Sequence, residues 1–212
     1  MKNSFFFVIA IVSFSFFGCG KDKNSNYVSV DKKVETEIIK EKALLPTPMD
    51  TLAYAERGLK YALSTQALLG KNLMQAIQKD GTLGALSFCN ENAYPLTDSM
   101  AVLHHAGLKR VSDKPRNQDN QANAEELEHI ETFKQIIANK ELPNPIVKDS
   151  DTQVQVYYPI LTNAMCLQCH GKPNKNITSS TLKQLTLLYP KDKAIGYAVN
   201  EVRGIWSVTF DK

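Results

Sequence analysis

The chain has 212 residues, of which 43% are hydrophobic, and its formal net charge is +3. This length is typical of one ordinary domain. The apolar content is sufficient for a packed core but too low for a protein with several membrane spans. A near-neutral charge without a basic cluster gives no support for nucleic-acid binding.

Residues 1–18 have the features of an export signal. Lys2 precedes the apolar run FFFVIAIVSFSFF, which is shorter than a membrane-spanning helix requires. The run ends at Gly18-Cys19, which resembles a bacterial lipoprotein signal in which Cys19 is lipidated and becomes the new N-terminus. A plain signal peptide or an uncleaved anchor is the alternative. Under each of these three interpretations the protein is exported.

Residues 19–48 are polar and mixed in charge, and they close with Pro46 and Pro48. We interpret them as a tether, with a partly helical arm as the alternative. Residues 49–212 then form the folded domain. Such a protein is a membrane-anchored lipoprotein in the periplasm or at the outer membrane, and Gly20 after the lipidated cysteine favours outer-membrane sorting.

Hydrophobic spacing predicts helices over 50–79, 82–104, 125–139 and 180–188, and strands over 108–111, 152–161, 194–199 and 205–210. Asp80-Gly81 is expected to end the first helix, and Pro95 to kink or split the second. Helices first and strands later indicate an α+β domain.

The four cysteines are Cys19, Cys89, Cys166 and Cys169. Exported proteins usually use cysteines in disulfide pairs. Here Cys19 belongs to the lipoprotein signal, and two cysteines belong to one short motif, so Cys89 is left without a partner. A buried small hydrophobe is the ordinary interpretation of such a residue.

Residues 166–170 read CLQCH, which is a CxxCH motif. Two thiols at this spacing can add to the vinyl groups of one haem, and the adjacent His170 then becomes the proximal iron ligand. A zinc knuckle would need two further Cys or His ligands nearby, and a thioredoxin-like redox pair would need a different strand–helix context. The sequence therefore predicts one covalently attached haem c.

The sixth iron ligand cannot be chosen from spacing alone. Thiolate is a strong ligand that ferric iron stabilises, whereas the histidines have other ordinary roles. His129 stands among three glutamates and is interpreted as a surface residue. The candidates are Cys89, His104, His105, His129, Met74, Met100 and Met165.

Four stretches carry a family resemblance: Cys89 to Pro95, GLKRVSDKPRNQDN at 107–120, YYPILTNAMCLQCHG at 157–171, and YPKDKAIGYAVNEVRGIWSV at 189–208. With them the chain resembles a family of bacterial domains of unknown function that carry a single c-type haem on a PAS-like fold. The resemblance spans about residues 50–212. It implies a PAS-like antiparallel sheet with long N-terminal helices packed on it.

The resemblance also implies Cys/His ligation of the haem iron, with His170 proximal and Cys89 the distal thiolate. The Arg/Asn loop of the family is matched by Arg110, Arg116, Asn117 and Asn120. Because arginine forks suit carboxylates, we interpret both arginines as candidate partners of the haem propionates. The alternative is that these arginines only stabilise the conformation of their own loop. Arg203-Gly204 matches the closing-strand motif of the family, in which glycine permits close backbone approach.

The function expected from these features is non-enzymatic single-electron transfer by a lipid-anchored monohaem protein, with a redox partner that the sequence does not identify. Thiolate ligation should keep its potential low. The alternative is a redox or diatomic-gas (NO or CO) sensor, in which the Cys89 thiolate is displaced and its helix moves. Because no kinase or receptor segment follows within the sequence, a sensor would need a partner protein. A peroxidase would need an open distal site with an acid–base group, which Cys-ligated iron opposes.

Overall fold

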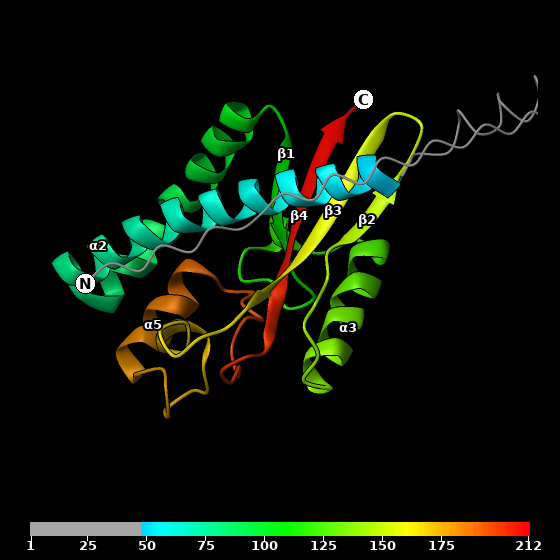
Figure 1. Ribbon diagram of the computed structural model, residues 1–212. Helices are drawn as coiled ribbons and strands as arrows, with labels where there is room; N and C mark the ends of the chain where they lie inside the picture. Colours follow the sequence, from blue (N-terminus) through cyan, green and yellow to red (C-terminus); the bar gives the residue numbers. More distant parts are fainter. Residues whose placement is uncertain (1–47) are drawn as a thin grey trace, which may run out of the picture. The chain divides into compact units, whose positions relative to one another are not determined.

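The computed structural model describes residues 48–212 (Figure 1), with side chains described from residue 50 onward. The predicted signal peptide and most of the tether, including Cys19, lie outside the described residues. In the part of the chain that is described, no helix is both apolar enough and long enough to cross a membrane.

The core of the fold is a four-stranded antiparallel sheet with the order β1-β4-β3-β2. The strands are β1 (Gly107–Val111), β2 (Ile146–Asp149), β3 (Gln153–Leu161) and β4 (Val202–Asp211). The C-terminal strand β4 lies inside the sheet, between β1 and β3 (Figure 1). Strand β4 therefore pairs with both β1 and β3, and it connects the first strand to the rest of the sheet.

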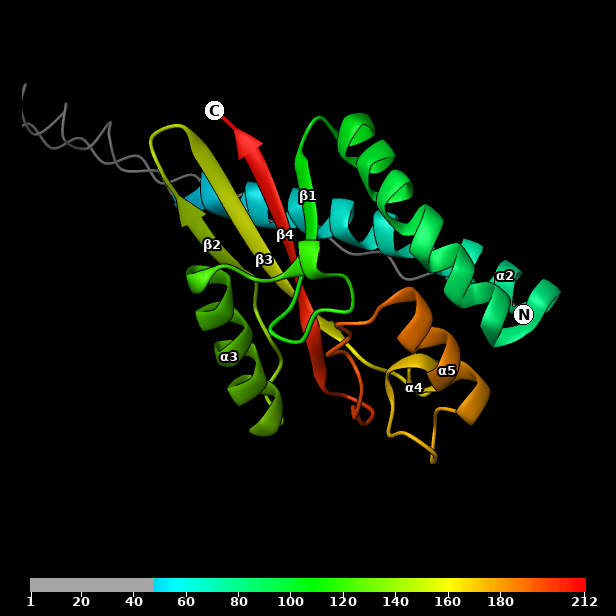
Figure 2. The ribbon, with the colours of Figure 1, turned by 180° about the vertical axis from the view of Figure 1, so that it is seen from behind.

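Helix α2 (Pro48–His104) consists of two helical parts that are separated at Gly81. Gly81 has φ 67° and ψ −168°, a conformation that glycine adopts without steric cost. The predicted break at Asp80-Gly81 is thus confirmed, and the second part returns toward β1 (Figure 2). No split occurs at Pro95, because Gly81 is the only residue inside α2 with non-helical dihedral angles.

Side chains on the two faces of the sheet form separate apolar clusters, as the alternation along a strand requires. Helix α2 covers one face, and helix α3 (Ala124–Ala138) packs against the other. The α2 cluster comprises Ala55, Ala62, Leu108, Val154, Val156, Tyr158, Trp206, Val208 and Phe210. The α3 cluster comprises Val111, Ala122, Ile130, Phe133, Tyr157, Val202 and Ile205.

The start of α3 is fixed by a capping box. The Asn123 side chain accepts a hydrogen bond from the Glu126 amide, and the Glu126 carboxylate accepts one from the Asn123 amide, each at 2.9 Å. The predicted third helix is confirmed. The interpretation of His129 as a surface residue is wrong: His129 is 8% exposed, and its ring lies 4.6 Å from that of Tyr157 on β3.

The remaining short elements are the 3-10 turn η1 (Gln118–Asn120), α4 (Leu167–His170) and α5 (Ser179–Leu188). Residues 194–199 form no strand, contrary to prediction, because their amides bond to the residues of the CxxCH segment: Gly196 N donates to Gly171 O at 2.8 Å, and Tyr197 N to His170 O at 2.9 Å. Sequence reasoning also missed the four-residue strand β2.

Candidate functional site

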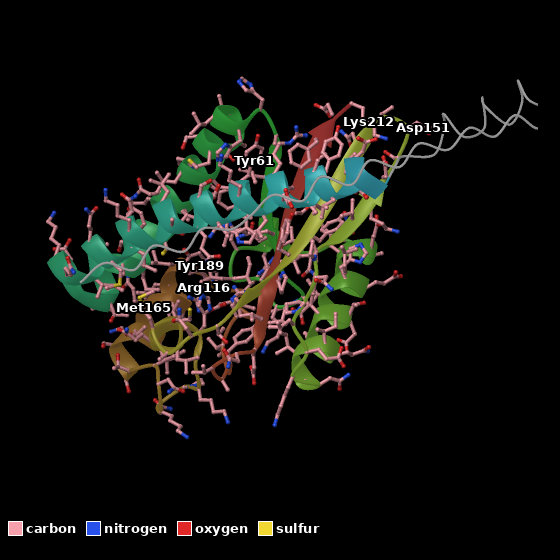
Figure 3. All side chains as sticks on the ribbon, viewed as in Figure 1. Tyr61, Arg116, Asp151, Met165, Tyr189 and Lys212 are labelled. Atoms are coloured by element: carbon pink, nitrogen blue, oxygen red, sulfur yellow. The ribbon has the colours of Figure 1, made fainter. Side chains whose placement is uncertain are left out.

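A cleft lies between α2, α4 and the β1–η1 segment. It consists of two adjoining cavities of about 250 and 470 Å³. Met165, Arg116 and Tyr189, which line the smaller cavity, lie between α2 and the α5 region in Figure 3. The two cavities are parts of one cleft because they share lining residues, namely Leu73, Cys89, Ala93, Arg110, Asn120, Met165, Cys166, His170 and Arg203.

The cleft brings together residues that are far apart in the sequence. Cys89 comes from the second part of α2, His170 and Cys169 from α4, and Arg110 from β1. All three cysteines among the described residues are free of disulfide bonds. The smaller cavity is lined by every predicted site residue that the structure describes: Cys89, Arg110, Arg116, Cys166, Cys169 and His170.

Asn163 sets the geometry at the start of the CxxCH segment. Its Oδ1 accepts hydrogen bonds from the amide of Met165 at 2.9 Å and from the amide and Sγ of Cys166 at 3.2 and 3.3 Å. The chain then makes the single turn α4, in which the His170 amide donates to the Cys166 carbonyl at 2.9 Å. Helical spacing directs Cys166 and Cys169 to the same side of this turn.

The His170 ring is held by a backbone carbonyl. Its Nδ1 lies 2.7 Å from the Ala194 carbonyl oxygen. Because a carbonyl only accepts, Nδ1 carries the hydrogen and Nε2 keeps a free lone pair. Arg203 Nε also lies 3.3 Å from Nδ1. Nδ1 cannot accept from Arg203 while it donates to Ala194, and the shorter contact decides the tautomer.

The His170 imidazole is kept neutral. Burial lowers its pKa well below the usual range, and the positive charges of Arg116 and Arg203 lower the pKa further. A neutral imidazole with Nδ1 protonated is the form that binds a metal through Nε2.

Cys89 has a different environment. Burial raises the pKa of its thiol, while the positive charges of Arg110 and Arg116 lower that pKa in part. Of the seven candidate sixth ligands, only Cys89 and Met165 line the cleft. His104 stacks on Tyr61 instead, with ring centroids 4.0 Å apart.

The two predicted arginines differ in their contacts. Arg110 donates from Nη2 to the Ala93 carbonyl at 3.4 Å, and its buried Nε has no hydrogen-bond partner among the described residues. Arg116 donates from Nε to Asp192 Oδ2 at 3.1 Å and from Nη2 to the Cys169 carbonyl at 2.6 Å. Arg110 thus retains an unused donor at the cleft, whereas Arg116 is held by protein acceptors.

The asparagines of the same loop have structural partners. Asn117 caps η1 by accepting from the Asp119 amide at 3.2 Å, and Asn120 accepts from the Tyr94 hydroxyl at 2.6 Å. A side chain at Gly204 would collide with the Val111 carbonyl, which confirms the close backbone approach predicted there.

Sequence reasoning missed Asp192 and Ala194. Ala194 acts through its carbonyl, which leaves no signal in the sequence. Asp192 Oδ1 accepts from the Ala194 amide at 2.7 Å, which is the turn that aspartate forms with the residue two positions later. This tendency of aspartate could have predicted the turn, but not the contact of the Ala194 carbonyl with His170.

Among residues 48–212 no group of three or more His, Cys, Asp or Glu side chains is arranged to hold a metal ion. Zinc in structural sites requires four such ligands.

Together the helices, the antiparallel sheet and the Cys/His-lined cleft define an α+β protein with a candidate cofactor site among residues 48–212. The model of the Tll0287-like family matches residues 25–210, and the chain therefore belongs to this family. The crystal structure of the cyanobacterial haem-protein Tll0287 is similar to this chain with a TM-score of 0.51 and 20% identity, over 73% of this chain and 94% of that chain. At this identity the likeness shows the fold alone. No curated protein sequence matches the chain.

Proposed function

We propose that this chain is an exported, lipid-anchored protein that carries one haem c and acts in single-electron transfer. Cys166 and Cys169 hold the haem covalently, and His170 and Cys89 ligate the iron. The observation that carries the proposal is the convergence of a CxxCH segment, an Nδ1-protonated histidine and one further thiol on a single cleft. The Tll0287-like family supports it, because the solved structure similar to this chain is that of a haem-protein.

The residues present fit a haem. Aliphatic and aromatic side chains, such as Leu73, Phe88 and Trp206, form much of the lining and suit the porphyrin faces. The unpartnered buried Nε of Arg110 suits an anionic group. We propose Arg110 as a partner of a haem propionate, since an arginine donor buried without an acceptor costs free energy.

Haem supplies a one-electron iron couple when it is bound. The chain would fix the His170 tautomer through Ala194, hold the start of the CxxCH turn through the bonds of Asn163 to the Met165 and Cys166 amides, and limit water through the apolar lining. No aspartate or glutamate is among the described residues that line the cleft. We propose a non-enzymatic role, because a Cys89 thiolate on the iron would leave no open position for peroxidase chemistry.

Haem attachment is tested by producing the full chain in a bacterial host with haem-attachment machinery. We expect the intact mass to increase by one haem and to keep this increase after denaturation. The variant Cys166→Ser/Cys169→Ser should lose it, while the matched thiol variant Cys89→Ser should keep it. Haem that is extracted from the wild-type chain by acidified solvent would contradict covalent attachment.

Lipid anchoring needs a separate test. Metabolic labelling with a fatty acid should mark the wild-type chain and leave Cys19→Ala unmarked, with both chains exported. A labelled Cys19→Ala chain would contradict the lipoprotein proposal without affecting the haem proposal.

A sensor is the second candidate function, acting through a partner protein in response to redox state or to NO or CO. The supporting observation is that Cys89 lies on the second part of α2, beyond the break at Gly81. A helix attached through such a break can move with less disturbance of the sheet than a strand residue could. Ferrous protein whose spectrum does not change under CO or NO favours electron transfer. A spectrum in which gas replaces Cys89 favours the sensor.

A further inference from the structure

Arg116 and Asp192 form a nearly buried ion pair behind His170. Their side chains are each 11% exposed, and Arg116 Nη2 lies 3.1 Å from Asp192 Oδ2. Neither side chain is required to close the sheet, because both lie in loops, one before η1 and one after α5. A buried ion pair is costly to desolvate, so its position calls for a physical explanation.

The contacts of the pair converge on the peptide groups that hold His170. Arg116 Nη2 donates to the carbonyl of Cys169, the residue directly before His170, at 2.6 Å. The same nitrogen donates at 3.3 Å to the Ala194 carbonyl, which is the acceptor of His170 Nδ1. Asp192 closes this network of hydrogen bonds, because its Oδ1 accepts from the Ala194 amide at 2.7 Å.

One oxygen atom thus serves two donors. The Ala194 carbonyl accepts from His170 Nδ1 at 2.7 Å and from a guanidinium at 3.3 Å. A cation beside a carbonyl draws electron density from it and makes it a weaker acceptor for its other donor. The strength of the Nδ1 hydrogen bond governs how basic a ligating imidazole is.

We propose that Arg116 is a positioning residue for His170, which sets the orientation of the imidazole through the Cys169 carbonyl and limits its basicity by sharing the Ala194 carbonyl. This inference rests on the proposed haem function and deepens it. It assigns Arg116 a role other than the propionate contact expected from the sequence. The adjacent backbone bonds Gly196 N to Gly171 O and Tyr197 N to His170 O keep Ala194 near His170 when Arg116 is replaced.

The sign of the effect follows from these contacts. Replacement of Arg116 by glutamine removes a cation, leaves the Asp192 carboxylate unbalanced and strengthens the Nδ1 hydrogen bond. All three changes favour ferric over ferrous iron, so the midpoint potential should fall. At the midpoint potential of the wild type, we expect the ferrous-to-ferric ratio of Arg116→Gln to decrease by about tenfold, which is about 59 mV for one electron.

The experiment is spectroelectrochemistry of the haem-loaded full chain, together with EPR of its ferric form. Lys193→Gln is the matched control, because it removes an exposed positive charge from the loop that holds Asp192. The ferrous-to-ferric ratio of Lys193→Gln should stay within about twofold of the wild type, since exposed charges are screened by solvent.

The double variant Arg116→Gln/Asp192→Asn keeps the net charge of the wild type, so it separates the effect of charge from that of hydrogen bonding. We expect its midpoint potential to lie below that of the wild type, by less than the decrease in Arg116→Gln. Its EPR lines should be broader than those of the wild type.

Two results would overturn the inference: equal shifts in Arg116→Gln and Lys193→Gln, or a wild-type potential and EPR line shape in the double variant. A third readout does not need haem. In the haem-free full chain, the ¹H–¹⁵N NMR signal of His170 Nδ1 should move downfield in Arg116→Gln and stay in place in Lys193→Gln. If the wild type takes up no haem, the proposed function fails, while this signal still decides the role of Arg116.

Discussion

The two sides of the cleft are built by different physical means. On the His170 side, directional hydrogen bonds tie three loop segments together, through Ala194, Arg116 and the backbone pair Gly196–Gly171. On the Cys89 side, helix α2 combines apolar packing of Leu86 against Ile177 and Leu185 with two side-chain hydrogen bonds, from Tyr94 to Asn120 and from Arg110 to the Ala93 carbonyl. Hydrogen bonds fix orientation, whereas apolar contact is non-directional. The His170 ring is therefore oriented by a hydrogen bond to its own nitrogen, whereas Cys89 is placed through the position of its helix.

Asp192→Ala should be the most damaging single change on the His170 side. It leaves the Arg116 cation without its carboxylate in a nearly buried position and removes the acceptor of the Ala194 amide. We expect a loss of about 4 kcal/mol in the free energy of unfolding, measured by urea denaturation. Lys148→Ala, which breaks an exposed pair with Glu125, should cost less than about 1 kcal/mol. Equal losses in the two variants would show that the hydrogen-bonded side is not specially constrained.

Leu86→Ala tests the packed side. Leu86 is 2% exposed and packs in a cluster with Ile177 and Leu185, three residues before Cys89 in the same helix, so truncation removes buried contacts and leaves a cavity. We expect a loss of about 3 kcal/mol by the same measurement. Leu187→Ala is the control, because Leu187 is 68% exposed and should change stability by less than about 0.5 kcal/mol. A Leu86 variant as stable as the control would mean that packing does not hold this helix.

Gly81→Ala sharpens the comparison at the break in α2. Gly81 has φ 67°, which strains any residue with a Cβ, so alanine should destabilise the protein by about 1 kcal/mol. Gly70→Ala is a matched control inside the helical first part, where nothing lies within 4 Å of a new Cβ. It should stabilise the protein by about 0.5–1 kcal/mol. The same sign in both variants would contradict the break.

The smallest expected effect is the pH dependence from His104, near the end of α2. Its ring bonds to Ser64 Oγ at 2.9 Å, and burial together with the charge of Lys60 lowers its pKa below the ordinary value of about 6.5. The unfolded chain therefore takes up the proton first as the pH falls. The stability that neutral His104 contributes is present above about pH 6.5 and is lost below it.

His104→Asn should reduce the loss of stability between pH 7.5 and pH 5, as measured by urea denaturation at each pH. The variant keeps Tyr61, on which the His104 ring stacks, so the two proteins differ at this position only in the residue that takes up the proton. If the variant loses as much stability as the wild type, the His104 side chain does not couple folding to pH.

Elements with local signals could be predicted from the sequence. The break at Gly81 follows from the Asp-Gly pair, and α3 follows from its apolar spacing. The site could be predicted only as a set of residues, because the CxxCH motif is contiguous whereas Cys89 and Arg110 reach the cleft through the tertiary fold.

The features that sequence reasoning missed depend on tertiary partners. His129 looks exposed among glutamates, but Tyr157 on a distant strand covers its ring. Residues 194–199 have a strand-like composition, yet their amides bond to Gly171 and His170. The difference between Arg110 and Arg116 likewise follows from acceptors that lie far along the chain, so no local pattern distinguishes the two.

The most direct test of the proposed Cys89/His170 haem site is ferric absorption and EPR spectroscopy of the haem-loaded chain beside Cys89→Ser. We predict a low-spin spectrum with thiolate character in the wild type, and its loss in Cys89→Ser while the haem stays covalently bound. Identical spectra in the two proteins would contradict the assignment of Cys89 and leave Met165 as the remaining candidate among the described residues that line the cleft.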